Sequence, residues 1–174
     1  NQIDWLKVIR NWQVGINAFI SQKTLFKTRP IVGFIHALVA WGFTLYLLVN
    51  LIDVLYGFIP NFRFLPNHIV GDVYRLSVDI FTVLVLIGVI YFILRRFVEK
   101  DKRLMINKPV LLSESALTGM RFDSLLVGSF IFIHVGSRFL SASFEIAGNH
   151  PDWSQPAANV VAKMWSGLNS ETII

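Results

Sequence analysis

The chain has 174 residues, of which 54% are hydrophobic, 14% aromatic and only 16% charged, with a formal net charge of +5. Average soluble domains carry about 25% charged residues, and a chain about one domain long has too small a core to bury this much apolar surface. Together with the absence of cysteine, the composition excludes an ordinary soluble enzyme, a disordered tail and a disulfide-stapled secreted module, and it predicts a membrane-embedded protein.

The first expected element is an amphipathic helix over residues 3–20. Its apolar residues recur at intervals of three or four: Trp5, Ile9, Trp12, Ile16 and Phe19. Such a helix is too polar to span a bilayer and is typical of one that lies in the membrane interface, although packing on a soluble partner gives the same pattern. A signal peptide is not expected, because no uninterrupted apolar core precedes a small-residue cleavage site.

Three long apolar stretches predict membrane-spanning helices. They cover Ile31–Ile52, Val73–Leu94 and Ser124–Phe144, with the full spans expected at about 31–56, 73–96 and 122–145. Each stretch has the roughly 20 residues that a helix needs to cross a hydrocarbon core of about 30 Å, and none has the polar stripe of a soluble bundle. The sequence predicts an all-α membrane protein: three transmembrane helices plus an N-terminal interfacial amphipathic helix, as part of a larger helical bundle.

These elements divide the chain into three parts. We expect a cytoplasmic interfacial helix and linker over 1–29, a transmembrane domain over 30–147 and an outer polar tail over 148–174. The tail is turn-rich, and we expect a short helix around Ala158–Leu168. Because the chain starts at Asn1 rather than Met, and its last residues resemble the start of another span, we expect a fragment of a longer membrane unit.

The basic residues predict the orientation of the spans. Five precede the first span, and seven lie between the second and third; the other side keeps Arg63, Arg75 and Lys163. The positive-inside rule then places the N-terminus and the 95–121 loop in the cytoplasm, as expected for a multi-pass protein of the inner (cytoplasmic) membrane. Because the basic residues adjoin the membrane ends, they imply the lipid bilayer and no nucleic acid as the partner.

Ionisable residues inside a span are costly and mark functional sites. His36 lies about 8 Å below the cytoplasmic edge of the first span, and His134 lies about 15 Å into the third. Arg138 follows His134 by one helical turn. Near the outer ends, Arg75 and Asp79 are also one turn apart, which favours an ion pair between them.

A neutral imidazole in hydrocarbon suits haem iron, which takes axial histidine and needs apolar walls. We therefore expect His36 and His134 to be axial ligands of haem b, with Arg138 as the partner of the haem propionates. Their different depths argue against a single shared haem, so each requires a second ligand from outside these residues. An interhelical hydrogen bond is the alternative role for each histidine. Without cysteine, zinc is disfavoured and a thiolate-bound iron–sulfur cluster is excluded within these residues.

Two stretches resemble a known family. The first is Gln22–Phe43, with Lys27-Thr28-Arg29-Pro30 and His36-x4-Trp41-Gly42-Phe43, and the second is Arg121–Ala147. Over roughly residues 20–150 the chain is similar to the nitrate reductase gamma-like membrane cytochrome b domain. That domain forms the N-terminal part of heterodisulfide-reductase-like membrane oxidoreductases, including the electron-transfer-flavoprotein:menaquinone oxidoreductases.

The resemblance implies the membrane part of a quinone oxidoreductase: a b-type cytochrome that passes electrons between a cytoplasmic donor and a membrane quinone. The donor would be an iron–sulfur cluster domain or subunit, an electron-transfer flavoprotein or a similar protein. A later helix would supply the second ligands of His36 and His134. Lys27 and Arg29 would border a quinone headgroup or an acidic docking surface, although the positive-inside rule explains them equally well.

Two other functions are compatible with three spans. A cofactor-free membrane anchor or scaffold subunit of a respiratory or redox complex would use His36 and His134 to bond neighbouring helices. Half of a transporter is disfavoured, because the spans lack the broken-helix pairs that such folds use.

Overall fold

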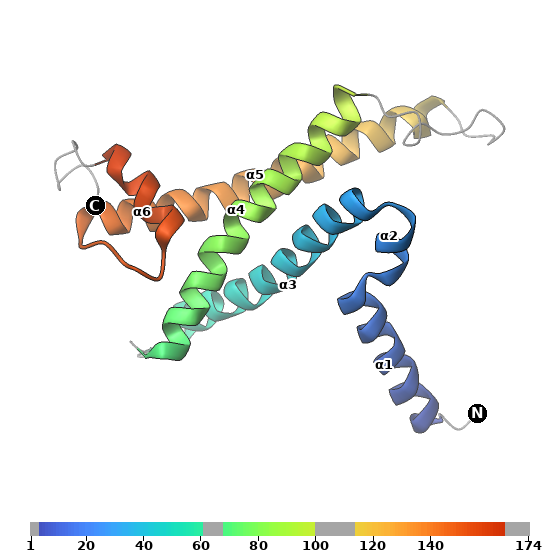
Figure 1. Ribbon diagram of the computed structural model, residues 1–174, viewed down its shortest axis with the longest axis horizontal. Helices are drawn as coiled ribbons and strands as arrows, with labels where there is room; N and C mark the ends of the chain where they lie inside the picture. Colours follow the sequence, from blue (N-terminus) through green and yellow to red (C-terminus); the bar gives the residue numbers. More distant parts are fainter. Residues whose placement is uncertain (1–3, 61–67, 100–113, 166–174) are drawn as a thin grey trace.

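The computed structural model describes residues 4–60, 68–99 and 114–165, and the regular structure within these ranges is helical (Figure 1). The elements in chain order are α1 (Trp5–Ser21), α2 (Lys23–Thr28), α3 (Pro30–Phe58), α4 (Ile69–Phe97), α5 (Glu114–Gly148), α6 (Pro156–Ala162) and the short 3₁₀-helix η2 (Lys163–Trp165).

Within the described residues, three helices are long and apolar enough to cross a membrane, which confirms the predicted all-α fold. They are α3, α4 and the Phe122–Gly148 part of α5. The 29 residues of α3 or α4 correspond to about 43 Å at 1.5 Å per residue. Each helix therefore extends past the hydrocarbon core, which is why the observed bounds exceed the charge-free stretches. The chain is a multi-pass membrane protein.

Helices α3 and α4 pack closely through two glycines in a reciprocal arrangement. Gly42 of α3 lies against Val85 of α4, and Gly88 of α4 lies against Val39 of α3. A Cβ atom at either glycine would approach the facing valine Cγ2 to less than 3.0 Å, closer than real Cβ contacts. Small residues at such a crossing let two helix backbones approach each other, which is the usual basis of helix association in membranes.

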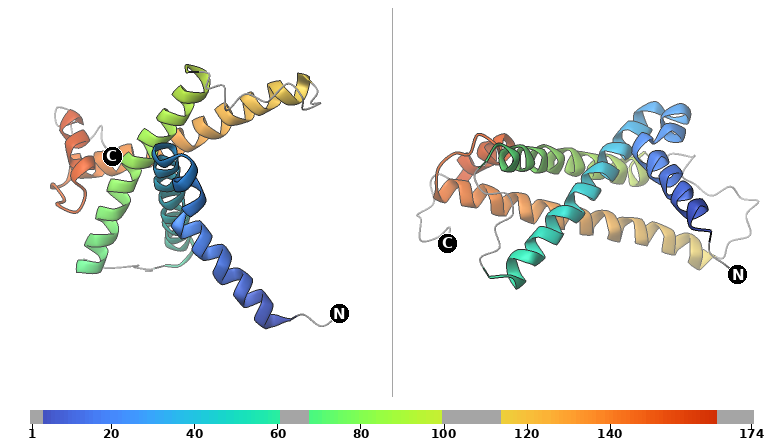
Figure 2. Two further views of the ribbon diagram at one scale, coloured as in Figure 1. Left: turned by 45° about the vertical axis from the view of Figure 1, so that its right-hand side comes forward. Right: turned by 90° about the horizontal axis from the view of Figure 1, so that it is seen from below.

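Helix α5 joins this pair along one side only. Val135 of α5 is buried with Tyr46, Val85 and Val89 in a common core. In the apolar window of α5, however, only 6% of the residues are buried, and the three helices cross rather than form a closed bundle (Figures 1 and 2). Most of the α5 surface is thus left to face lipid or further helices.

Helix α1 confirms the amphipathic helix predicted over residues 3–20. The Asp4 side chain caps its start by accepting a hydrogen bond from the Lys7 backbone N–H (3.1 Å), and Gln22 ends it with a left-handed φ of 47°. No residue of α1 is buried, and the helix extends away from α3, α4 and α5 (Figure 2). Its location in the membrane interface stays a prediction.

The short helix predicted around Ala158–Leu168 begins earlier than expected. Helix α6 starts at Pro156, whose fixed φ suits a first helical position, and it continues into η2 after Ala162. Residues 166–174, with the last part of the predicted helix and the suspected start of another span, lie outside the described residues. Helix α6 packs on the end of α5, where Ala158 and Ala162 are buried with Ile146.

Candidate functional site

The first candidate ligand, His36, lies on α3 near the end that follows α2. Its residue surface is exposed, and its ring meets Phe92 of α4 edge-on, with 6.3 Å between ring centroids. The imidazole is therefore flanked by an aromatic wall on one side and open on the other.

The second candidate ligand, His134, lies on α5 and is also exposed. Its ring stacks on Phe130 one turn away (centroids 6.1 Å apart) and meets Tyr46 of α3 edge-on at 6.4 Å. Since Tyr46 and His36 are ten residues apart on α3, the two imidazoles lie at levels about 15 Å apart. This separation agrees with the sequence argument that they do not share one haem.

Neither imidazole has a hydrogen-bond partner within residues 4–60, 68–99 and 114–165. The interhelical hydrogen bond considered as an alternative role is thus not made between α3, α4 and α5. The other two histidines do not approach them, because His68 caps α4 through a long contact with the Val70 N–H (3.5 Å) and His150 follows α5 at the α6 end. A second ligand for either imidazole would have to come from elsewhere.

Arg138, the predicted propionate partner, is engaged by a carboxylate of another span. Its guanidinium forks onto Asp53 of α3, with Nη1 on one carboxylate oxygen and Nη2 3.2 Å from the other. This bidentate pair joins α5 to α3 across 85 positions of sequence, and it uses the donors that a propionate would need. The spacing of residues along one helix does not predict the Arg138–Asp53 pair, because the two residues lie on different helices.

The predicted Arg75–Asp79 pair is wrong, because each residue has a different partner. Arg75 forms an ion pair with Asp72 one turn earlier on α4, and its Nε lies 3.3 Å from Asp152 and 3.1 Å from the Ser154 hydroxyl, to which it donates. The Asp152 carboxylate, which lies between α5 and α6, thus takes the place that Asp79 was expected to fill.

Asp79 instead caps α6. This carboxylate is 4% exposed and accepts hydrogen bonds from the backbone N–H groups of Ala157 (2.7 Å) and Ala158 (3.0 Å). Those N–H groups have no partner within their own helix, and the positive end of a helix favours a negative charge. A second link is the Trp165 Nε1, which donates to Ser143 of α5 at 3.0 Å. The residues after α5 are thus bonded to both α4 and α5.

Asp152 is held in its charged form at this junction. Burial alone would raise the pKa of its carboxyl group, but hydrogen bonds from Ser154 and Gln155 and the charge of Arg75 outweigh burial. The pKa of Asp152 therefore lies below its ordinary value of 3.8.

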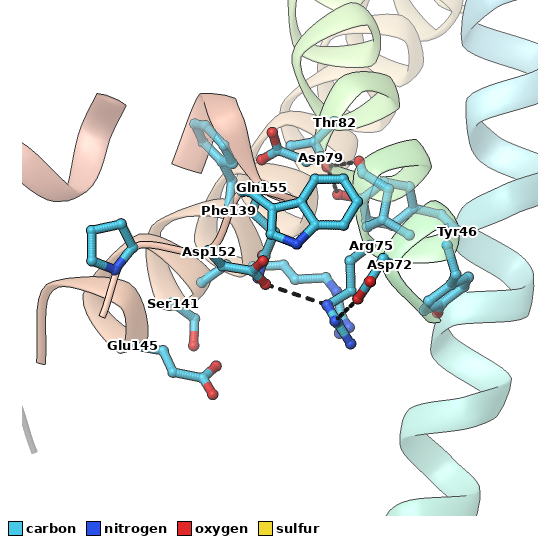
Figure 3. Close-up of a pocket in the computed structure, with 16 residues that line it drawn as sticks. Tyr46, Asp72, Arg75, Asp79, Thr82, Phe139, Ser141, Glu145, Asp152 and Gln155 are labelled. Atoms are coloured by element: carbon cyan, nitrogen blue, oxygen red, sulfur yellow. Dashed lines mark hydrogen bonds and ion pairs between the residues drawn. The ribbon is translucent and has the colours of Figure 1, made fainter. Parts of the chain in front are cut away.

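These polar groups surround a cavity of about 810 Å³ between α3, α4, α5 and the residues before α6. Figure 3 shows Arg75 between Asp72 and Asp152 at this cavity. At its inner end, Tyr46 and Thr82 are both buried, and their hydroxyl groups share a 2.6 Å hydrogen bond. The sequence analysis noted the charges but not this cavity, because its walls come from segments far apart in the chain.

Fold and site together define a multi-pass helical membrane protein with polar groups concentrated at one end of its spans. No group of three or more histidine or acidic residues placed to hold a metal ion occurs in the part of the chain that the structure describes. The chain matches no known family model, no curated protein and no solved structure.

Proposed function

We propose that the chain is a membrane b-type cytochrome-like domain that transfers electrons between a cytoplasmic iron–sulfur or flavin partner and a membrane quinone. The observation that carries this proposal is that two imidazoles within the spans, at levels about 15 Å apart, have no hydrogen-bond partner among the described residues. Burying a polar group in hydrocarbon without a hydrogen-bond partner or a ligand costs free energy, and haem iron commonly binds an imidazole nitrogen.

The surroundings of the two histidines fit a haem in part. Each imidazole is exposed on its helix and adjoins an aromatic ring, Phe92 for His36 and Phe130 for His134, so a flat apolar ring would find an apolar wall at each level. Each histidine would supply one ligand to the haem iron, and a second ligand would have to come from a helix outside the described residues. A bound haem would supply a one-electron redox centre.

The chain's own residues would position these centres and set their surroundings. Helix α3 holds His36 near one face of the membrane, while α5 holds His134 deeper. Apolar side chains of the shared core, such as Val85 and Val135, exclude water between the two levels. Low polarity near a haem is one of the factors that tune its potential.

The distribution of basic residues supports a cytoplasmic N-terminus and an outer position for α6. His36 would then serve the cytoplasmic side, where the electron donor docks, and His134 the outer half. Lys27 and Arg29, just before α3, border the cytoplasmic end and suit an acidic docking surface or a quinone headgroup.

One observation favours a second candidate, a cofactor-free anchor for a membrane complex. Arg138 is engaged by Asp53, so the cation expected for a haem propionate already has a carboxylate partner. Under the anchor function, α5 would use its open surface to bind helices of a partner, and those helices would bond His134.

The visible spectrum of the complete protein, purified from its native membrane, separates the two functions. We expect a reducible b-type band that is lost in the His36→Ala/His134→Ala double variant and kept in His68→Ala, the matched control outside the proposed ligand set. A colourless protein that is folded and bound to its partners would contradict the cytochrome proposal and leave the anchor.

A further inference from the structure

The cavity at the α6 end is lined by two polar stripes at helical spacing. On α5 the stripe is Arg138, Ser141 and Glu145, at intervals of three and four residues that keep side chains on one helix face. On α4 the stripe is Asp72, Arg75, Asp79 and Thr82. Both stripes run along spans, so polar groups continue well below the helix ends.

The stripe on α4 ends near the middle of that helix. Thr82 lies thirteen residues after the first residue of α4, or about 20 Å along a helix of about 43 Å. Its hydroxyl and that of Tyr46 bond each other at 2.6 Å, and beyond this pair the helices meet through Val85, Val89 and Val135. The cavity therefore lies in one half of the spans and ends at this layer of apolar side chains.

The charges around the cavity are mainly negative. Four acidic side chains line it, against two arginines, and both arginines are occupied by carboxylates. In the described residues the Glu145 carboxylate makes no ion pair, and Glu145 is exposed at the cavity. Acidic groups around a confined space raise the local concentration of cations and lower that of anions.

We propose that this cavity is a water-filled vestibule that admits small hydrophilic cations from the α6 end to the Tyr46–Thr82 pair. Ionisable residues within spans characteristically face a water-filled space of this kind, and a cavity of about 810 Å³ is large enough for many waters. The vestibule is a property of α4, α5 and the α6 segment, and it requires no haem.

The test compares thiol reactivity at two positions of α4 in the complete protein, reconstituted in lipid nanodiscs. Val78→Cys places a thiol in the cavity wall. Ile80→Cys, two residues on, places it on the exposed outer surface of the same helix, where lipid or another helix covers it. Positively and negatively charged methanethiosulfonates of similar size are the probes, and mass spectrometry of the modified peptide gives the rates.

We expect Val78→Cys to react about tenfold faster than Ile80→Cys, and about tenfold faster with the cationic than with the anionic reagent. Adding Glu145→Gln should lower the cationic-to-anionic ratio. Ser141→Cys, with Leu140→Cys as its control, repeats the test on α5 in case Val78→Cys does not fold. Equal rates at cavity and control positions would overturn the vestibule, and a cationic rate no higher than the anionic rate would overturn its preference for cations.

Discussion

The bond between Asp79 and α6 allows a prediction about local stability. Helix α6 has seven residues, too few to form a stable helix alone, so its order depends on what it contacts. Asp79, which lies within a span, accepts hydrogen bonds from two backbone N–H groups of α6. Asp79→Ala removes both acceptors and leaves those donors buried or solvated by water.

The size of the effect follows from the two bonds. A hydrogen bond to a charged group contributes about 1.5–3 kcal/mol, and losing a helix cap costs about 0.5–2 kcal/mol. Two such bonds would contribute about 3–6 kcal/mol, more than the loss of one helix cap, so we expect an intermediate fall of about 2–4 kcal/mol in the free energy of local opening of α6. At about 1.4 kcal/mol per factor of ten, amide hydrogen exchange at Ala157 and Ala158 should accelerate roughly 30-fold to 1,000-fold.

Hydrogen exchange with mass spectrometry on the reconstituted protein measures this change. Asp79→Asn keeps one acceptor oxygen and should give an intermediate rate. Asp72→Asn, which alters an ion pair of Arg75 rather than the cap, should change the exchange of Ala157 and Ala158 by less than about fivefold. Exchange at the unmodified rate in Asp79→Ala would refute the reasoning, because α6 would then be held by its apolar contacts alone.

Three further predictions concern stability. Gly42→Ala should lower the free energy of unfolding by about 1–3 kcal/mol, measured as a lower thermal midpoint in detergent, because its Cβ would overlap a side chain of α4. Gly57→Ala, with open space around it, should leave the midpoint unchanged. Asp152 should contribute fully to the stability of the α6 junction above its ordinary pKa of 3.8, and this contribution should be lost as the pH falls through the lower pKa of the folded protein. Tryptophan fluorescence should therefore show the junction loosening in acid, and Asp152→Asn should abolish this pH dependence. Arg138→Ala should lower the midpoint more than the Asp53→Ala/Arg138→Ala double variant does, since only the single variant leaves a carboxylate without its partner; an equal loss in both would contradict this role.

The spans and the amphipathic α1 could be predicted because their signals are local. A run of apolar residues without charge, or apolar residues at helical spacing, is read from neighbouring positions. The ion pairs between distant segments, Arg75–Asp152 and Arg138–Asp53, could not be predicted in this way. Arg75 and Asp79 have ideal spacing on one helix, yet Asp79 bonds a backbone 78 positions away.

The same limit applies to the cavity and to the depth of the histidines. Residue counts along the spans predict that His134 lies deeper than His36 by about 7 Å, whereas the contact of His134 with Tyr46 separates the two levels by about 15 Å. The Arg138–Asp53 pair and the Tyr46–Thr82 bond depend on how α3, α4 and α5 cross. Gly42 and Gly88 against facing valines set the close contact of α3 with α4, a long-range fit that a single sequence does not display.

We propose that His36 and His134 bind separate haems at two levels of the membrane. Potentiometric titration of the b-type band, with haem content per chain, tests it most directly in the complete protein and the two single alanine variants. Two redox transitions are predicted, with His36→Ala and His134→Ala each removing a different one and about half of the haem. Loss of all haem in either single variant, or a full complement in both, would contradict the assignment.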